Sequence, residues 1–274
     1  MSSSALLLAA LALAPAQPPA GGIALSNIRN THGELGGTRP DNKFLPGDVV
    51  FVAFDIEGLT VGPKGDVKYS MAMEVTDKNN KKIFPPPTEP NTPTTRNDYM
   101  PLGGNKLPGR AFVTCGMDLD PGECTLKLVV TDEGSKQAFT LTRKFEVLKR
   151  DFGIAAVFAS QDEAGNIPAA TTGVVGSMIF VRYGVVNFAR DPNTKQPNVV
   201  VEITTLDESG KPTVKEPVVR EYKNGIPEDR LGFPDGVALP LTRVGKFTVK
   251  IKATDKVANK SYTFDLPIAA VPPG

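Results

Sequence analysis

The feature that most constrains this chain is a pattern of residues that occurs twice in the same order. Three blocks recur, and their first residues form the pairs Pro46 and Val175, Glu74 and Thr204, and Pro121 and Val244. The offsets are 129, 130 and 123 residues. In the third block, PGECTLKLVVTD aligns with VGKFTVKIKATD, and Gly, Thr, Lys, Thr and Asp coincide without a gap. A duplicated domain explains such an ordered repeat better than chance.

The third block also alternates between apolar and polar residues. In the second copy, Phe247, Val249, Ile251 and Ala253 would share one face of a strand, and the intervening lysines and threonines the other. This pattern predicts a strand with one buried and one solvated face. Comparable segments recur along the chain, while 25 prolines and 26 glycines supply turns. We therefore expect an all-β fold of two consecutive antiparallel sandwiches.

The first copy is about seven residues longer than the second between its second and third blocks. The extra length falls in residues 85–95, a polar stretch with five prolines that cannot form a central strand. It is a candidate binding loop, and the alternative is an ordinary loop that crosses the end of a sandwich. The candidate residues are Pro85, Pro86, Pro87, Thr88, Glu89, Pro90, Asn91, Thr92 and Pro93.

The N-terminus carries a short apolar run, Leu6–Leu13, followed by Ala14-Pro15-Ala16. The run and the small residues after it are typical of a secretory signal peptide cleaved after residue 16, although residues 2–4 supply no positive charge. We expect a signal peptide over 1–16, an N-terminal extension over 17–40, a first sandwich over 41–150 and a second over 151–274. The mature protein would be extracytoplasmic, in the periplasm, on the cell surface or secreted.

Each copy ends with a glycine, an alternating strand that closes on Thr-Asp, a polar turn and a last strand, Ala138–Leu148 or Ser261–Val271. This order resembles the late strands of bacterial immunoglobulin-like and fibronectin type III-like domains. Cys124 and Phe247 stand where those families commonly have a tyrosine. The resemblance implies tandem immunoglobulin-like β-sandwiches and a binding or structural role.

Two cysteines, Cys115 and Cys124, bracket a turn and are the candidate disulfide of an exported chain. Two buried free thiols are the alternative. Their spacing is not the C-x-x-C of zinc or redox motifs.

Other chemistry has little support in the sequence. The single histidine, His32, has no catalytic or metal-binding motif around it. Oxygen ligands for Ca²⁺ could come from Asp118, Asp120 and Glu123, or from Asp77, Asn79 and Asn80, but turn formation also explains these residues. A sugar site would need aromatic platforms; the chain has no tryptophan, although loop tyrosines such as Tyr99 and Tyr222 could converge. We predict no catalytic, cofactor-binding or metal-binding residue.

Charge narrows the choice of partner. The 31 Lys and Arg residues nearly balance the 30 Asp and Glu residues, so no net field draws the chain to nucleic acid. The apolar run is also too short for a membrane span. We expect a secreted, non-enzymatic structural, adhesive or scaffolding protein that binds another protein or an envelope component. A ligand-binding accessory module for carbohydrate or calcium is the second hypothesis. The oligomeric state stays open.

Overall fold

The computed structural model describes residues 22–86 and 88–274. The expected signal peptide, residues 1–16, lies outside the described residues, as does Pro87 of the candidate loop. Strands and turns make up the described part of the chain, so the all-β prediction is confirmed. Within these residues no helix has the length and apolar character needed to cross a bilayer.

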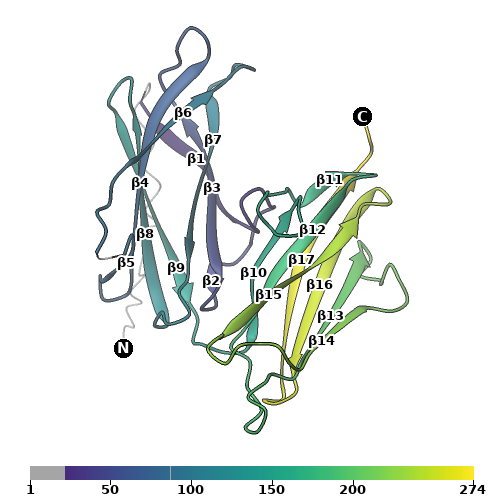
Figure 1. Cartoon of the computed structure of the whole chain (residues 1–274). Coiled ribbons are helices and arrows are strands. Elements are labelled where there is room, and N and C mark those ends of the chain that lie inside the picture. The colour runs from purple at the N-terminus through teal and green to yellow at the C-terminus, as the bar shows by residue number, and fades with distance from the viewer. Residues whose placement is uncertain (1–21, 87) are drawn as a thin grey trace, which may run out of the picture.

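The first half of the chain forms two facing sheets (Figure 1). One sheet has the order β1-β3-β7, and the other has the order β2-β9-β8-β4-β5, with β6 also paired to β4. The strands are β1 (Ala24–Thr31), β2 (Lys43–Phe44), β3 (Val49–Glu57), β4 (Asp66–Thr76), β5 (Lys82–Phe84), β6 (Thr94–Tyr99), β7 (Lys106–Thr114), β8 (Gly122–Asp132) and β9 (Ala138–Val147).

The second half repeats this arrangement, with sheets β10-β12-β15 and β11-β17-β16-β13-β14. Its strands are β10 (Gly153–Ser160), β11 (Thr172–Val174), β12 (Met178–Val186), β13 (Val199–Asp207), β14 (Val218–Tyr222), β15 (Gly232–Pro240), β16 (Gly245–Asp255) and β17 (Lys260–Val271). Each half encloses its own apolar core, to which both of its sheets contribute. We call the halves the first and second sandwich.

The sheets differ from the expected purely antiparallel pairing at two edges. β2 runs parallel to β9, and β11 runs parallel to β17. In each sandwich the opening segment first pairs within the three-stranded sheet, as β1 or β10. The chain then crosses to the other sheet and forms β2 or β11. Each of these short strands pairs in parallel with the last strand of its sandwich, β9 or β17.

The first sandwich also begins earlier than residue 41. Residues 17–40 were expected to form an extension, but Ala24–Thr31 forms β1 and pairs with β3. A β-bulge hides this strand from a pattern search, because the register shifts between Ser26 and Arg29 and Asn27 adopts a φ of 50°. The extra residue resets the alternation of buried and exposed side chains. β10 has the same bulge, with Ala156 at a φ of 50°.

The two copies share turn chemistry as well as strand order. Asp132 and Asp255 are both fully buried at the ends of β8 and β16. Asp132 accepts hydrogen bonds from the backbone N–H groups of Ser135 and Thr60, at 2.8 and 3.3 Å. Asp255 accepts equivalent bonds from Val257 and Ala189, at 2.9 and 2.7 Å. Buried carboxylates are tolerated here because backbone amides satisfy them.

A separate apolar cluster joins the two sandwiches. Leu45 from the first packs with Ala155 and Val186 of the second, and Met117 and Tyr262 lie against them. Asp48, which is 3% exposed, anchors the contact. Its carboxylate accepts the Ala156 N–H at 2.8 Å and pairs with the Arg39 guanidinium at 2.9 Å. The sandwiches therefore meet through both apolar and hydrogen-bonded contacts.

Candidate functional site

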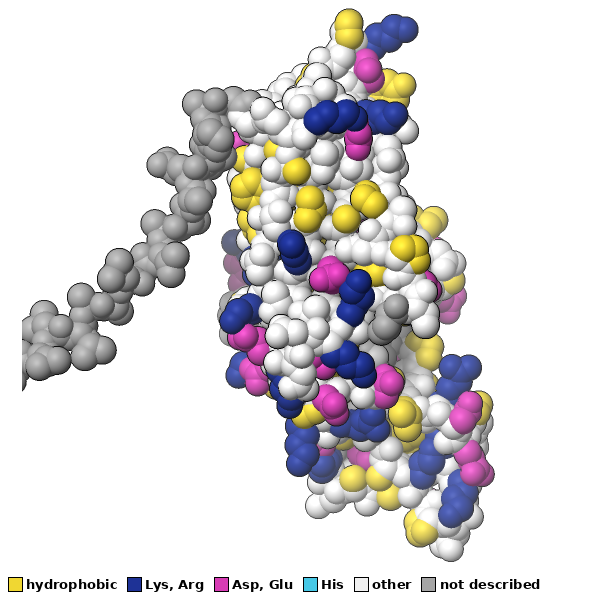
Figure 2. Space-filling model, turned by 90° about the vertical axis from the view of Figure 1, so that its left-hand side faces the viewer, with side chains coloured by type: hydrophobic (Ala, Val, Ile, Leu, Met, Phe, Trp, Pro, Cys, Tyr) yellow, Lys and Arg dark blue, Asp and Glu magenta, His cyan; other side chains and the backbone are white. Residues whose placement is uncertain are grey.

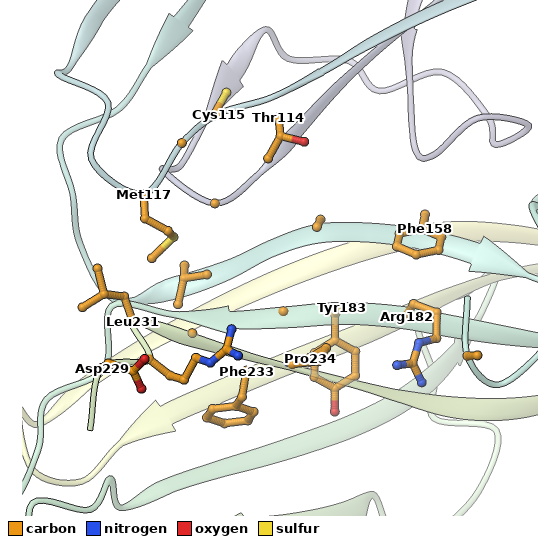
Figure 3. Close-up of a pocket in the computed structure, with 18 residues that line it drawn as sticks. Thr114, Cys115, Met117, Phe158, Arg182, Tyr183, Asp229, Leu231, Phe233 and Pro234 are labelled. Atoms are coloured by element: carbon orange, nitrogen blue, oxygen red, sulfur yellow. The ribbon is translucent and has the colours of Figure 1, made fainter. Parts of the chain in front are cut away.

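A cleft of about 560 Å³ opens between the two sandwiches (Figure 3). Its floor is the outer face of β10, β12 and β15 of the second sandwich, and its roof is the end of β7 with the turn that follows. The residues that line it are Gly47, Thr114, Cys115, Gly116, Met117, Ala156, Phe158, Ala164, Arg182, Tyr183, Gly184, Val186, Asp229, Arg230, Leu231, Gly232, Phe233 and Pro234.

Small residues keep the floor of the cleft low. Gly184 of β12 and Gly232 of β15 have no side chain, and Ala156 of β10 adds only a methyl group. A Cβ built at Gly184 meets only backbone oxygens, the nearest 3.5 Å away, so space above this position is open. The sheet backbone is therefore accessible at the floor of the cleft.

The roof and ends of the cleft supply the larger groups. Met117 points from the roof toward the floor, and Figure 3 shows Arg182 and Asp229 at opposite ends. Gly47 adopts a φ of 94°, and a Cβ there would lie 2.6 Å from the Met117 sulfur, so only glycine fits beneath this methionine. The result is a mainly apolar slot with charged groups near its ends.

The two cysteines lie in the core of the first sandwich. Cys115, at the end of β7, and Cys124, in β8, are both buried and are free thiols in this structure. Burial raises the pKa of Cys115 to about 12 and that of Cys124 to about 11, and nearby carboxylates act in the same direction. Thiols in this state are protonated and are poor nucleophiles or metal ligands. The disulfide between them stays a prediction.

The candidate proline-rich loop connects β5 to β6. Pro85 is buried, whereas Pro86 and residues 88–93 are exposed, and β5 and β6 pair with the same side of β4. The loop thus spans the stretch of that edge between the two short strands. Its exposure is what a binding loop needs, and its use in binding stays a prediction.

His32 lies where the two sandwiches meet. Its ring packs edge-on against Phe264 of the second sandwich, with 5.7 Å between ring centroids, and its Nδ1 has no hydrogen-bond partner among the described residues. Burial and the nearby Arg39 lower its pKa to about 4, although Asp41 opposes them. The histidine is therefore neutral and part of the packing at neutral pH.

Among the candidate calcium ligands, Asp77 stabilises a turn. The Asp77 carboxylate accepts the backbone N–H groups of Asn79 and Lys81, at 2.8 and 2.9 Å. Across the described ranges 22–86 and 88–274, no three His, Cys, Asp or Glu side chains gather as a metal site would require.

The tyrosines that could have converged on a sugar do not meet. Tyr99 lies at the end of β6 in the first sandwich, and Tyr222 lies in β14 of the second. The Tyr222 and Tyr183 hydroxyls both donate to Asp235 of β15, at 2.6 Å for Tyr183. Arg220 completes this network by an ion pair with the same carboxylate.

The cleft between the sandwiches has almost no signal in the sequence. Its residues come from strands up to about 190 positions apart, and glycines on an outer sheet face give no periodic signal. One signal was available: Gly184 interrupts β12, which is otherwise rich in valine and aromatic residues, and such a glycine indicates close approach of another group.

Comparison with known proteins gives a limited likeness. The chain matches no family model and no curated protein. A family 123 glycoside hydrolase from Clostridium perfringens matches with a TM-score of 0.33 and 12% identity, over 46% of this chain and 27% of that chain. This chain therefore spans about a quarter of the hydrolase.

Two antigen I/II domains match over most of the length of this chain. The C-terminal domain of the Streptococcus agalactiae antigen I/II polypeptide BspA has a TM-score of 0.30 and 8% identity, over 90% of this chain and all of that one. The corresponding domain of Streptococcus pyogenes AspA has a TM-score of 0.29 and 10% identity, over 90% and 99%. Because these scores are low, the function proposed next rests on the residues of this chain.

Proposed function

We propose that the mature chain is an extracytoplasmic, non-catalytic protein with an adhesive or scaffolding role, and that it binds another protein through the cleft between its two sandwiches. The observation that carries this proposal is the cleft itself, a mainly apolar slot to which both sandwiches contribute. Accessible apolar surface that is hollowed and bordered by charge is typical of binding sites.

The geometry of the cleft favours a protein segment over a compact cofactor. The slot lies between two packed bodies, so its width depends on the contact made by Asp48 and Leu45. Its charged ends, Arg182 and Asp229, suit the polar rim that surrounds the apolar centre of a protein interface. A loop or hairpin of a partner could place apolar side chains on the glycine floor.

The surface charge agrees with a protein or envelope partner. On the face shown in Figure 2, Lys and Arg side chains lie among Asp and Glu side chains and do not gather in a patch of one sign. Nucleic-acid binding relies on a concentrated basic surface.

Calcium binding has less support than protein binding. The Asp77 carboxylate already accepts two backbone hydrogen bonds, and Asp207 accepts the same two in the second copy, from Ser209 and Lys211. The same turn in both copies shows a structural use for these oxygens.

Filling the cleft tests the proposal. Gly184→Phe would place a ring on the floor, and Thr263→Phe would add the same ring on an exposed position of β17, away from the cleft. Each mature protein would be used as bait for cell-envelope and culture fractions of the source organism. We expect the wild type and Thr263→Phe to retain one protein in near-stoichiometric yield and Gly184→Phe to lose it. Equal retention by both variants, or recovery of glycan alone, would contradict the proposal.

A further inference from the structure

A second groove, of about 330 Å³, lies on the first sandwich and shares no residue with the cleft. It follows the facing edges of β6 and β7, which belong to different sheets and form their ends in the described chain. Its polar and aromatic lining includes Tyr69, Arg96, Asp98, Tyr99, Arg110 and Phe112.

The polar groups of this groove include both donors and acceptors. The Tyr69 hydroxyl donates to the Asp98 carboxylate at 2.9 Å, and Arg110 pairs with Glu34 at 3.5 Å. Arg96 adds a second guanidinium. Two guanidinium groups and two carboxylates leave no net charge, so the groove offers fixed donors and acceptors without attracting ions of either sign.

Two exposed aromatic side chains line the same groove. Tyr99 is 67% exposed and Phe112 is 56% exposed. Phe112 also packs against Phe51 of β3, with 5.8 Å between ring centroids, which restrains its ring. A phenylalanine held this openly beside hydrogen-bonding groups offers an apolar surface to a ligand with both polar and apolar faces.

In the second sandwich the corresponding boundary, between β14 and β15, is closed by side chains; we call this boundary between the two sheets the seam. There Tyr183 of β12 pairs in register with Asp235 of β15, and that carboxylate holds Tyr222 and Arg220 of β14. In the first sandwich, Phe54 stands at the position of Tyr183, offset by 129 residues, and its register partner is Gly109. This position has no carboxylate, and among the described residues no side-chain hydrogen bond or ion pair joins β7 to β6.

Gly109 cannot be replaced by a residue that would close the seam in the same way. A Cβ at this position would lie 2.2 Å from the Phe54 ring. The duplicated unit therefore has one copy with a seam closed by its own side chains and one copy with an open, polar and aromatic groove. Because the two copies otherwise match, this difference indicates that the open groove of the first sandwich binds a ligand.

We propose that the β6–β7 groove of the first sandwich binds a neutral oligosaccharide. A pyranose ring presents an apolar C–H face that stacks on Tyr99 or Phe112. Its hydroxyls both donate and accept, as Asp98, Glu34, Arg96 and Arg110 require. The absence of net charge among these four groups favours a neutral sugar over an acidic one. The size of the groove suits one or two sugar rings.

The test uses the mature full chain and isothermal titration with neutral cello-, xylo-, manno- and chito-oligosaccharides, with oligogalacturonate as the acidic comparison. We expect at least one neutral oligosaccharide to bind with a dissociation constant at or below about 1 mM. Tyr99→Ala and Phe112→Ala should each weaken that binding about fivefold to tenfold, which corresponds to the loss of one aromatic contact. Both side chains are exposed, so both variants should fold.

Val218→Ala in β14 is the matched control, because it truncates an exposed side chain on the corresponding edge strand of the second sandwich. Its affinity for the oligosaccharide should equal that of the wild type. The proposal is overturned if no neutral oligosaccharide binds, if oligogalacturonate alone binds, or if the two aromatic variants and Val218→Ala behave alike. Because Gly184→Phe leaves this groove intact, sugar binding by that variant separates this site from the cleft.

Discussion

At the scale of single residues, Asp48 carries the contact between the sandwiches. Asp48→Ala would leave the buried Ala156 N–H without its acceptor, and it would remove one of the two carboxylates that pair with Arg39, the other being Asp41. Breaking a buried pair on one side costs about 3 kcal/mol of unfolding free energy. Urea unfolding measures this loss, and amide exchange at Ala156 should become faster. Ser177→Ala, at the matching exposed position of the second copy, should change stability little. If Asp48→Ala lowered stability as little as Ser177→Ala, Asp48 would not stabilise the contact between the sandwiches.

His32 gives the chain a pH dependence in mildly acidic solution. Its pKa in the folded state is about 4, below the unfolded value of about 6.5, so the unfolded chain takes up the proton first. The stability contributed by the neutral ring is complete above about pH 6.5 and falls as the pH drops toward 4. Unfolding midpoints at pH 7 and 4.5 should therefore differ more for the wild type than for His32→Gln. An equal difference in both proteins would rule out His32 as the cause.

At the scale of elements, Cys115 at the end of β7 and Cys124 in β8 lie in the same core as free thiols. We predict that they form a disulfide in protein recovered from an oxidising compartment, where closing so short a loop stabilises by about 2 to 3 kcal/mol. Alkylation of the unfolded protein, with and without reductant, followed by mass spectrometry shows whether the two cysteines are bridged. Two alkylated thiols without reductant would show that the cysteines stay free.

The elements also show what sequence can predict. The strand over Phe247 to Asp255 was correctly anticipated, because alternation within one strand is a local property. β1 gives no such signal, because the bulge at Asn27 breaks the alternation of buried and exposed residues, and the pattern there predicts an extension instead of a strand. The β6–β7 groove depends on which strands end their sheets and on a single glycine, Gly109. Sheet order is a long-range property, so this site has no local signal in the sequence.

At the scale of the whole molecule, Leu45 sets how firmly the sandwiches are held together. Leu45→Ala removes a side chain packed against Ala155 and Val186 and should cost about 2 to 4 kcal/mol. Small-angle scattering at neutral pH should then show a wider spread of interdomain distances. Leu141→Ala, buried within the first core, should lower stability without widening that spread. An unchanged profile for Leu45→Ala would mean that other contacts fix the angle.

The bulges shared by β1 and β10 have a consequence for self-association. β1 ends its sheet in the described chain, and such an edge could template a strand from another copy. At Asn27 the bulge interrupts the regular spacing of backbone N–H and C=O groups. A strand from another copy could therefore form only a few consecutive backbone hydrogen bonds along β1. Because β10 has the same irregularity, the outer edge of the three-stranded sheet in each copy lacks the regular ladder that strand addition between copies requires.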